Sequence, residues 1–339
     1  MSLYGRIMHW RERVLTQRDT HRKVYPFEWG LEWLGMEGNG RPPLQVLLDL
    51  AQDSLSDSEA FFALPEEHVR GRWAKRGDHL EFESPADCLL EQNNRVRCRV
   101  FEAPASRRAV VVLPQWNADE ESHVGLCRVL SKLGITAVRH ALPFHEHRRP
   151  QGMVRADYMV SPNIGRTIHA VRQAVLETRR LVHLLGEKGY RHIGVMGTSI
   201  GSCVGYLSFL HEPLLKTGVF NFVSGWFADV VWQGNATRYV RRGLEGRVSL
   251  EDLRRCWAPI SPMAYVQRAA ADRRRHLLIS ARYDLTFLPE MSEEVFKAYR
   301  RYGGRPEVAY LPCGHYTTAR FPFKYLDGWH ICRYLRRHL

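Results

Sequence analysis

The sequence predicts an α/β fold, in which a mostly parallel central sheet carries helices on both of its faces. Two observations support this prediction. From residue 78 onward, short apolar runs typical of strands alternate with patterns typical of helices. Some of these runs, such as 109–113, are apolar at every position, as strands buried on both faces are. The length of 339 residues fits one large domain or one domain with extensions.

The expected strands follow one another at regular intervals. Residues 78–83 and 95–101 are predicted to form an opening hairpin, and residues 109–113, with the sequence Ala-Val-Val-Val-Leu, a buried strand. The later strands are expected at 135–138, 192–196, 218–223, 276–280 and 306–311.

Helices are expected between these strands. Residues 120–133 suit a helix that ends at Gly134. A longer helix is predicted to begin near Ser161 and Pro162, because serine caps a helix and proline fits its first turn. The apolar positions of this longer helix lie three or four residues apart and therefore share one face: Ile164, Ile168, Val171 and Val175.

Two segments fall outside the alternation of strands and helices. Residues 1–75 are rich in large aromatic side chains, and we interpret them as a helical extension packed on a main domain of residues 76–339. Residues 225–271 lie between two predicted strands and are longer than an ordinary crossover. We interpret this second segment as a helical lid insertion.

Composition and charge narrow the class of protein. The net charge is +13, but the basic residues are spread along the whole chain and are not interleaved with aromatics, which argues against a nucleic-acid partner. No stretch approaches the roughly 20 apolar residues that span a bilayer, and the N-terminus lacks the apolar core of a secretory signal. The seven cysteines are scattered and form no Cys-x-x-Cys pair. We therefore expect a cytoplasmic protein with reduced thiols.

The motif Gly-x-Ser-x-Gly at 197–201 is the strongest chemical signal in the chain. It stands between the predicted strand at 192–196 and an apolar segment at 202–210 that suits a buried helix. Strand, tight turn and helix are the setting of a nucleophile elbow, whose glycines let strand and helix approach closely. The setting predicts that Ser199 is a nucleophile.

A serine nucleophile needs a base, and the base needs a carboxylate that orients it. After a nucleophile elbow the chain order is Ser, then Asp or Glu, then His. Asp284 follows the predicted strand at 276–280, and His315 follows the one at 306–311. Asp229, which follows the preceding strand, is the competing carboxylate. We predict the triad Ser199, Asp284 and His315.

The oxyanion of the reaction also needs backbone N–H donors. The first donor is predicted to be Ile200, directly after the nucleophile. The second is expected in the loop after the strand at 109–113, with Trp116 preferred and Gln115 as the alternative.

These motifs resemble those of the α/β-hydrolase superfamily, over roughly residues 78–339. The resemblance rests on the elbow, on Arg282-Tyr283-Asp284 and on Cys313-Gly314-His315. Many members have His-Gly in the oxyanion loop, where this chain has Pro114-Gln115-Trp116. A Leu-Pro-x-x-x-x-Arg-x-Pro phrase after the strand at 135–138 is similar to a branch named for hydrolase domain 18.

The loop at 139–150 and the start of the lid supply the candidate substrate-binding residues. His145, His147 and Arg148 lie in the loop, where Arg148 or a histidine is expected to contact an anionic part of the substrate. His145, Glu146 and His147 also have the spacing of metal ligands, but no third ligand is evident, so we predict no metal. Trp226 is the candidate from the lid.

The expected function is a serine hydrolase that cleaves a carboxylic ester through an acyl-enzyme, without a cofactor. A thioesterase, an amidase or a peptidase would use the same triad. A lipid hydrolase at a membrane surface is motivated by the positive charge, the Arg-rich N-terminus and the aromatic lid. A non-catalytic binding protein on a hydrolase fold is a further alternative. We prefer an esterase with a small-molecule or lipid-like ester substrate.

Overall fold

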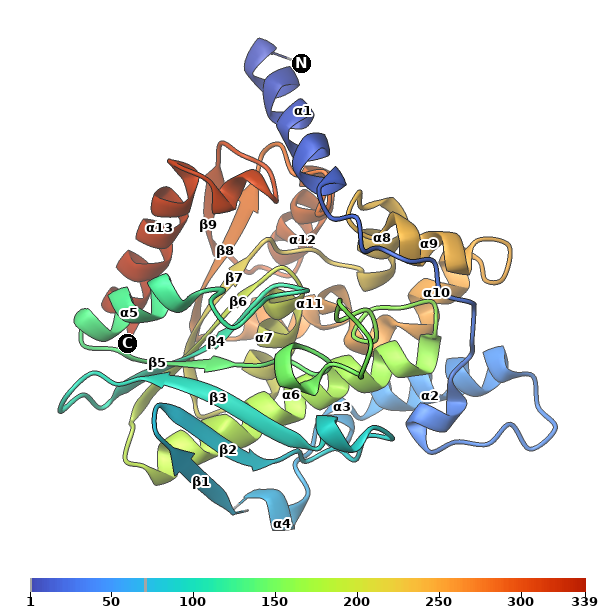
Figure 1. Ribbon diagram of the computed structural model, residues 1–339, viewed down its shortest axis with the longest axis horizontal. Helices are drawn as coiled ribbons and strands as arrows, with labels where there is room; N and C mark the ends of the chain where they lie inside the picture. Colours follow the sequence, from blue (N-terminus) through green and yellow to red (C-terminus); the bar gives the residue numbers. More distant parts are fainter. Residues whose placement is uncertain (1, 70–71) are drawn as a thin grey trace.

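One mixed sheet organises the chain (Figure 1). The structure is a computed structural model and describes residues 2–69 and 72–339. The sheet has nine strands in the order β1-β2-β3-β5-β4-β6-β7-β8-β9. The strands are β1 (Trp73–Arg76), β2 (His79–Glu83), β3 (Arg95–Phe101), β4 (Arg108–Leu113), β5 (Thr136–His140), β6 (His192–Thr198), β7 (Leu215–Asn221), β8 (Arg275–Ala281) and β9 (Glu307–Leu311).

The sheet changes from antiparallel to parallel along its width. Strands β1, β2 and β3 pair antiparallel with one another, and β3 pairs antiparallel with β5. All strands from β5 to β9 pair parallel. The predicted hairpin at 78–101 is therefore confirmed, and so is the mostly parallel sheet. Strand β1 was not predicted and begins inside the segment that we interpreted as a helical extension.

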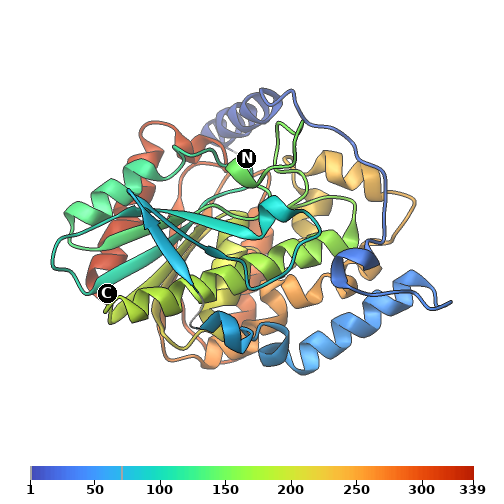
Figure 2. The same ribbon diagram turned by 60° about the horizontal axis from the view of Figure 1, so that its bottom comes forward.

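Helices cover both faces of the sheet (Figure 2). Helices α5 (Val124–Lys132) and α13 (Phe323–His338) bury Cys127, Leu130 and Leu335 against one face, where β4 contributes Val110 and Val112. Helices α6 (Ile164–Glu187) and α7 (Ile200–His211) pack on the other face. The remaining helices are α1 (Leu3–Gln17), α2 (Pro43–Ser56), α3 (Ser58–Phe61), α4 (Glu66–Val69), α8 (Phe227–Gln233), α9 (Arg238–Leu244), α10 (Leu250–Cys256), α11 (Val266–Ala271) and α12 (Pro289–Arg301).

The two predicted helices form with shifted starts. Helix α5 begins at Val124, after His123 in a left-handed conformation, so the predicted start at residue 120 is four residues early. Helix α6 is capped by Asn163, whose side chain accepts from the N–H of Arg166, and not by Ser161. Ser161 instead bonds the guanidinium of Arg166. Both Ser161 and Asn163 are suitable caps, and the sequence alone does not distinguish them.

The segment before residue 76 wraps around the main domain in contact with it. The N–H of Glu28 donates to the carbonyl of Pro162, and the side chain of Trp33 packs near Phe144 and Tyr158. Helix α2 packs against α10. Within the described residues no helix is long and apolar enough to cross a membrane.

Candidate active site

The turn between β6 and α7 has the geometry of a nucleophile elbow. Ser199 has a φ of +58° and a ψ of −121°, a conformation that non-glycine residues rarely adopt. A Cβ at Gly197 would lie 1.9 Å from the carbonyl oxygen of Gly201, and one at Gly201 would lie 2.2 Å from that of Leu113. Only glycine fits at both places, so the motif permits the sharp turn that presents Ser199.

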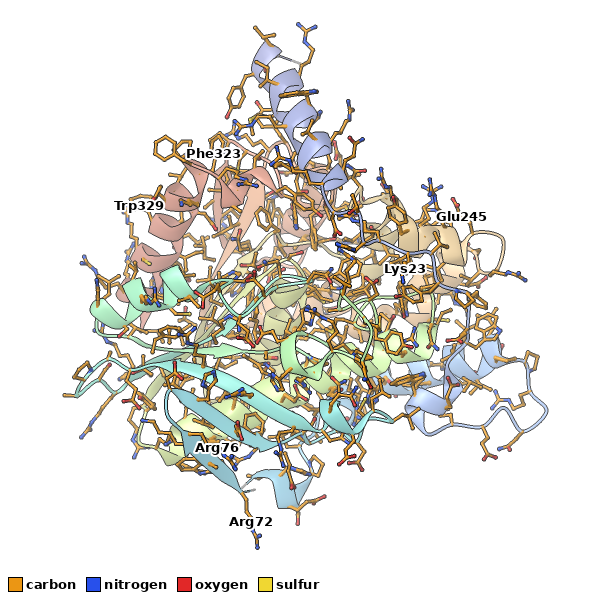
Figure 3. The ribbon with its side chains drawn as sticks, in the orientation of Figure 1. Lys23, Arg72, Arg76, Glu245, Phe323 and Trp329 are labelled. Atoms are coloured by element: carbon orange, nitrogen blue, oxygen red, sulfur yellow. The ribbon has the colours of Figure 1, made fainter. Side chains whose placement is uncertain are left out.

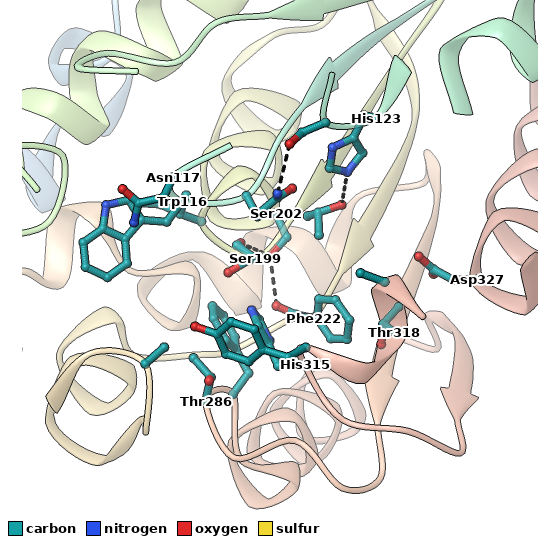
Figure 4. A pocket seen from close by; sticks show the side chains of 18 of the residues that line it. Trp116, Asn117, His123, Ser199, Ser202, Phe222, Thr286, His315, Thr318 and Asp327 are labelled. Carbon is teal, nitrogen blue, oxygen red and sulfur yellow. Dashed lines mark hydrogen bonds between the residues drawn. The ribbon is translucent and has the colours of Figure 1, made fainter. Parts of the chain in front are cut away.

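Asp284 and His315 lie together at the same edge of the sheet. Nδ1 of His315 donates to Oδ2 of Asp284 at 2.9 Å. The other oxygen of Asp284 accepts from the N–H groups of Thr286 and Phe287, at 2.7 and 2.8 Å. These bonds fix the carboxylate and leave Nε2 of His315 as the free acceptor of the neutral ring. Ser199 and His315 line one cavity, and Figure 4 shows their side chains facing each other across it.

Two aromatic rings pack against the imidazole of His315. The ring of Phe287 is stacked on it, with centroids 5.3 Å apart, and the ring of Phe222 lies 4.6 Å away. Burial alone would lower the pKa of His315, but the charge and hydrogen bond of Asp284 outweigh it and raise the pKa above its usual 6.5. A base with a pKa in this range suits proton transfer near neutral pH.

Asp229, the competing carboxylate, has a different partner. Its two oxygens accept from Nε and Nη2 of Arg254, at 2.5 and 3.0 Å. The residue sits in the first turn of α8 and is 4% exposed. A carboxylate held by an arginine in this way is not available to orient His315.

The two predicted oxyanion donors come from different elements, the start of α7 and the loop after β4. Ile200 is the first residue of α7, where N–H groups have no partner inside the helix. In the loop after β4, the N–H of Asn117 donates to Nε2 of His145 and that of Ala118 to the carbonyl of Gln115. These bonds occupy the N–H groups of the two later residues of the loop. The N–H groups of Trp116 and Gln115 therefore stay candidates for the second oxyanion donor. The indole of Trp116 is fixed by a 2.8 Å bond from Nε1 to the carbonyl of Ala156.

His145 supports the loop of Trp116 and does not contact the cavity. It is 1% exposed, and its Nδ1 donates to the carbonyl of Pro143 while Nε2 accepts from Asn117. Burial lowers the pKa of His145 to about 4, so the ring is neutral and keeps this pattern of donor and acceptor. The predicted contact of His145 with substrate is therefore corrected, because its side chain holds the loop in place instead.

Arg148 is also structural. Its side chain is fully buried, and its guanidinium forms two bonds with the carboxylate of Glu177, at 2.5 and 2.8 Å. His140 reaches the same carboxylate at 3.1 Å. A guanidinium that is enclosed and paired cannot meet an anionic substrate, so this prediction is corrected. The sequence pattern did not reveal that Glu177, in the middle of α6, is its partner.

The other two candidate substrate residues lie away from Ser199. His147 is exposed and lines a separate, polar cavity of about 340 Å³ with Arg97 and Arg139. Trp226 precedes α8 and is half-buried, and it is not among the residues that line the cavity of Ser199. Its neighbour Phe227 lines that cavity instead.

The cavity at Ser199 has a volume of about 1080 Å³. Much of its wall is apolar, with Ile200, Phe222 and Phe287 around the triad. The insertion at 225–271 folds into α8 to α11 and supplies Phe227 and Val231 to the wall. The predicted insertion therefore covers part of the cavity, as a lid would.

The wall of the cavity at Ser199 also contains polar groups. His123, Thr198 and Asp327 line it. Nε2 of His123 lies 2.9 Å from the hydroxyl of Thr198, and Oδ2 of Asp327 accepts from the side-chain amide of Asn221 at 2.8 Å. Oδ1 of Asp327 and Nδ1 of His123 have no hydrogen-bond partner among the described residues. Burial raises the pKa of Asp327 to about 7.

The N-terminal segment contributes to the site, which was not predicted. Glu12 is fully buried and accepts from the N–H groups of Tyr316 and Thr317, directly after His315. Arg22 donates to the carbonyl of Ala236 in the lid and to the hydroxyl of Tyr316. No motif marks these side chains in the sequence, because their partners lie about 200 to 300 residues away.

His145 and His147, the histidines with the spacing of metal ligands, have different surroundings. Within residues 2–69 and 72–339, no group of three or more His, Cys, Asp or Glu side chains is placed to hold a metal ion. His145 is buried beneath the loop of Trp116, whereas His147 is exposed.

Comparisons with known proteins bear on the fold. No protein-family model matches the sequence, and no curated protein matches it. Among solved structures, an acetyl xylan esterase from Paenibacillus sp. R4 is similar, with 14% identity and a TM-score of 0.59 over 90% of this chain and 97% of that one. The esterase Pf2001 of Pyrococcus furiosus has 14% identity and a TM-score of 0.54 over 81% of this chain and 94% of that one.

A third similar structure is larger than this protein. The acylaminoacyl peptidase of Pyrococcus horikoshii has 13% identity and a TM-score of 0.56 over 80% of this chain and 43% of that one. The chain thus spans less than half the length of that peptidase. Together with the order and direction of the strands, these likenesses show that the chain has the α/β-hydrolase fold.

Proposed function

We propose that the protein is a serine hydrolase that cleaves a carboxylic ester. The observation that carries the proposal is the bond of His315 to Asp284 on the rim of the cavity that contains the strained Ser199. Esterases are among the structures of the same fold. The apolar wall of the cavity favours an ester with an apolar acyl or alcohol group.

The reaction would proceed in two halves. Nε2 of His315 takes the proton of the Ser199 hydroxyl while Oγ bonds to the carbonyl carbon of the ester. The N–H groups of Ile200 and Trp116 hold the oxyanion. The C–O bond to the alcohol breaks, and His315 returns the proton to the leaving alcohol. Water then attacks the acyl-enzyme with His315 again as base, which releases the acid and frees Ser199.

Asp284 would support the base in both halves. Its hydrogen bond keeps the proton of neutral His315 on Nδ1, and its charge stabilises the imidazolium that forms during each transfer. Glu12 is hydrogen-bonded to the residues directly after His315 and adds a further negative charge.

A fluorophosphonate probe tests the nucleophile directly. We expect the wild type to be labelled at Ser199 and the Ser199→Ala variant to lose labelling. Ser224→Ala is the matched control, because Ser224 lines the same cavity and is similarly buried, at 6% exposure for both residues. Equal labelling of wild type and Ser199→Ala would overturn the assignment.

The choice of scissile bond is tested with matched substrates. We expect p-nitrophenyl esters to be cleaved faster than thioesters and aminoacyl anilides with the same acyl group. The anilides are included because an acylaminoacyl peptidase is among the structures with the same fold. Faster cleavage of the anilide would replace the esterase by a peptidase with the same triad, and no turnover of any substrate would favour a non-catalytic binding protein.

A further inference from the structure

Helix α1 turns an apolar stripe away from the protein. Leu3, Ile7 and Trp10 are three or four residues apart and therefore share one helical face. Their exposed fractions are 67, 46 and 63%. The opposite face buries Met8 and Glu12 against the main domain, at 1 and 0%. The stripe is therefore not part of the core, although its three side chains are large and apolar.

Arginines border this stripe on both sides. At 100° per residue, Arg6 and Arg13 fall on one side of it, and Arg11 and Arg18 fall on the other. The only carboxylate of the helix, Glu12, is buried on the opposite face. The outward face thus combines apolar and positively charged groups with no acidic group. This combination is typical of a helix that lies in the interface of an anionic membrane, with arginines reaching the headgroups.

The same side of the protein has a second set of exposed aromatic residues. Helices α1 and α13 both pack against the short turn η6 (Thr317–Ala319). Around the start of α13, Phe321, Tyr325 and Trp329 are exposed by 75, 63 and 49%. In Figure 3 the labelled Phe323 and Trp329 lie along α13, in the upper left of the view, and α1 projects from the top. Tyr325 and Trp329 also line the cavity of Ser199, so this face adjoins the candidate active site.

We propose that the outward face of α1, formed by Leu3, Ile7 and Trp10 with Arg6 and Arg13, docks on an anionic phospholipid membrane. A membrane supplies both partners that the face needs, anionic headgroups for the arginines and an apolar layer for the stripe. A second copy of this chain is a poorer partner, because two such faces would bring arginines together in a two-fold contact. The inference goes beyond the proposed hydrolase activity and does not depend on it.

Co-sedimentation of the full chain with vesicles tests the proposal. We use phosphatidylcholine vesicles with and without phosphatidylglycerol, at low and high salt. We expect binding to the anionic vesicles only, and weaker binding at high salt because the headgroup attraction is screened. Ile7→Glu/Trp10→Glu removes the stripe and should weaken binding on the order of tenfold or more. Arg6→Glu/Arg13→Glu should weaken it at least on the order of tenfold.

Two matched controls separate this face from general effects of charge and hydrophobicity. Leu89→Glu/Val154→Glu changes two apolar residues elsewhere that are 62 and 61% exposed and adds the same charge as the stripe variant. Arg191→Glu/Arg305→Glu makes the same change in net charge as the arginine variant, at exposed positions away from α1. We expect both controls to bind as the wild type does. Melting temperatures of all variants show that each one is folded.

Three results would overturn the proposal. The first is no co-sedimentation of the wild type with anionic vesicles at low salt. The second is an equal loss of binding in the control variants, which would indicate non-specific attraction to the net charge of +13. The third is a wild type that is oligomeric in solution, with stripe variants that are monomeric and still bind vesicles, which would assign the face to a second copy of this chain.

Discussion

The carboxylate of Glu12 accepts a 2.7 Å hydrogen bond from the N–H of Thr317, two residues after the candidate base His315. A second bond, at 3.0 Å, comes from the N–H of Tyr316. A Cβ at Gly314 would lie 2.4 Å from Cδ of Glu12, so glycine at that position lets the carboxylate approach the loop. The N-terminal helix thus holds the loop of His315, and Glu12 is a positioning residue in the proposed mechanism.

Loss of the Glu12 carboxylate should disturb the loop. Glu12→Ala leaves two buried N–H groups without an acceptor, which costs about 1–3 kcal/mol for each group that stays unpaired. A shift of His315 by roughly 1 Å would lower kcat by up to about 100-fold. We expect kcat for a short soluble ester to fall with little change in KM. Glu307→Ala, at an exposed position, serves as the control, and an unchanged kcat in Glu12→Ala would contradict the positioning role.

The pH dependence of Glu12→Gln separates charge from position. Asp284 and, beyond it, Glu12 raise the pKa of His315 above 6.5. The base must be neutral, so kcat/KM of the wild type should rise with pH through a value above 6.5. Glutamine has nearly the size of glutamate but keeps only one of the two oxygens that accept from Tyr316 and Thr317, so some loss of kcat is expected. It also removes one negative charge, so this acid limb should move to lower pH. The full profile of kcat/KM against pH measures the shift, and a limb that stays in place would rule out a charge effect.

Two carboxylates that both follow strands of the sheet should differ sharply in their effect on activity. Asp284→Asn removes the acceptor that keeps the proton of His315 on Nδ1, and we expect kcat to fall by up to about 10⁴-fold. Asp229→Asn disturbs the pair with Arg254 and should leave kcat within about tenfold of the wild type. Comparable losses in both variants, with melting temperatures near that of the wild type, would contradict the triad.

The sequence predicted those parts of the structure that depend on local patterns. Apolar runs located the strands, and the glycines of 197–201 located the elbow, because a close approach of backbones requires them. Asp284 and His315 were chosen because each follows a predicted strand and because they come after Ser199 in the chain in the order Asp, then His. These features are encoded by neighbouring residues.

The sequence did not predict contacts between distant segments. His145 and Arg148 stand in a loop near the sheet edge, which suggested a contact with substrate, but the partners Asn117 and Glu177 turn both side chains into the protein. Glu12 lies in an Arg-rich helix for which the sequence indicated no part in the site. Side-chain direction in loops depends on tertiary packing, and no local spacing reveals it.

The buried pair of Arg148 and Glu177 should matter for stability. Glu177→Gln leaves an enclosed guanidinium without a counter-charge, which costs about 3–5 kcal/mol of unfolding free energy. Glu245→Gln breaks an exposed pair with Arg241 and should cost no more than about 0.5 kcal/mol. Urea unfolding of both variants measures the difference. Similar small losses in the two would show that the buried pair is not required.

The same pair predicts how stability changes in acid. Burial alone would raise the pKa of Glu177, but Arg148 and its other partners lower it to about 2, below the usual 4.5. A carboxyl with a lowered pKa contributes stability that is present above about 4.5 and is lost as pH falls toward about 2. We therefore expect the melting temperature of the wild type to fall more steeply than that of Glu177→Gln over this range.

Asp327 should have the opposite effect on stability. Burial raises its pKa from 3.8 to about 7, so the folded protein holds the proton more tightly than the unfolded chain does. The stability that this group contributes is present below about pH 3.8 and is lost as the pH rises through about 7.

The side chain introduced by Asp327→Asn cannot ionise, and its amide can donate to Oδ1 of Asn221, which has no partner among the described residues. We expect Asp327→Asn to raise the melting temperature at about pH 8 and to have a smaller effect at about pH 4. An equal rise in melting temperature at both pH values, or a fall at the higher pH, would show that ionised Asp327 does not destabilise the folded protein.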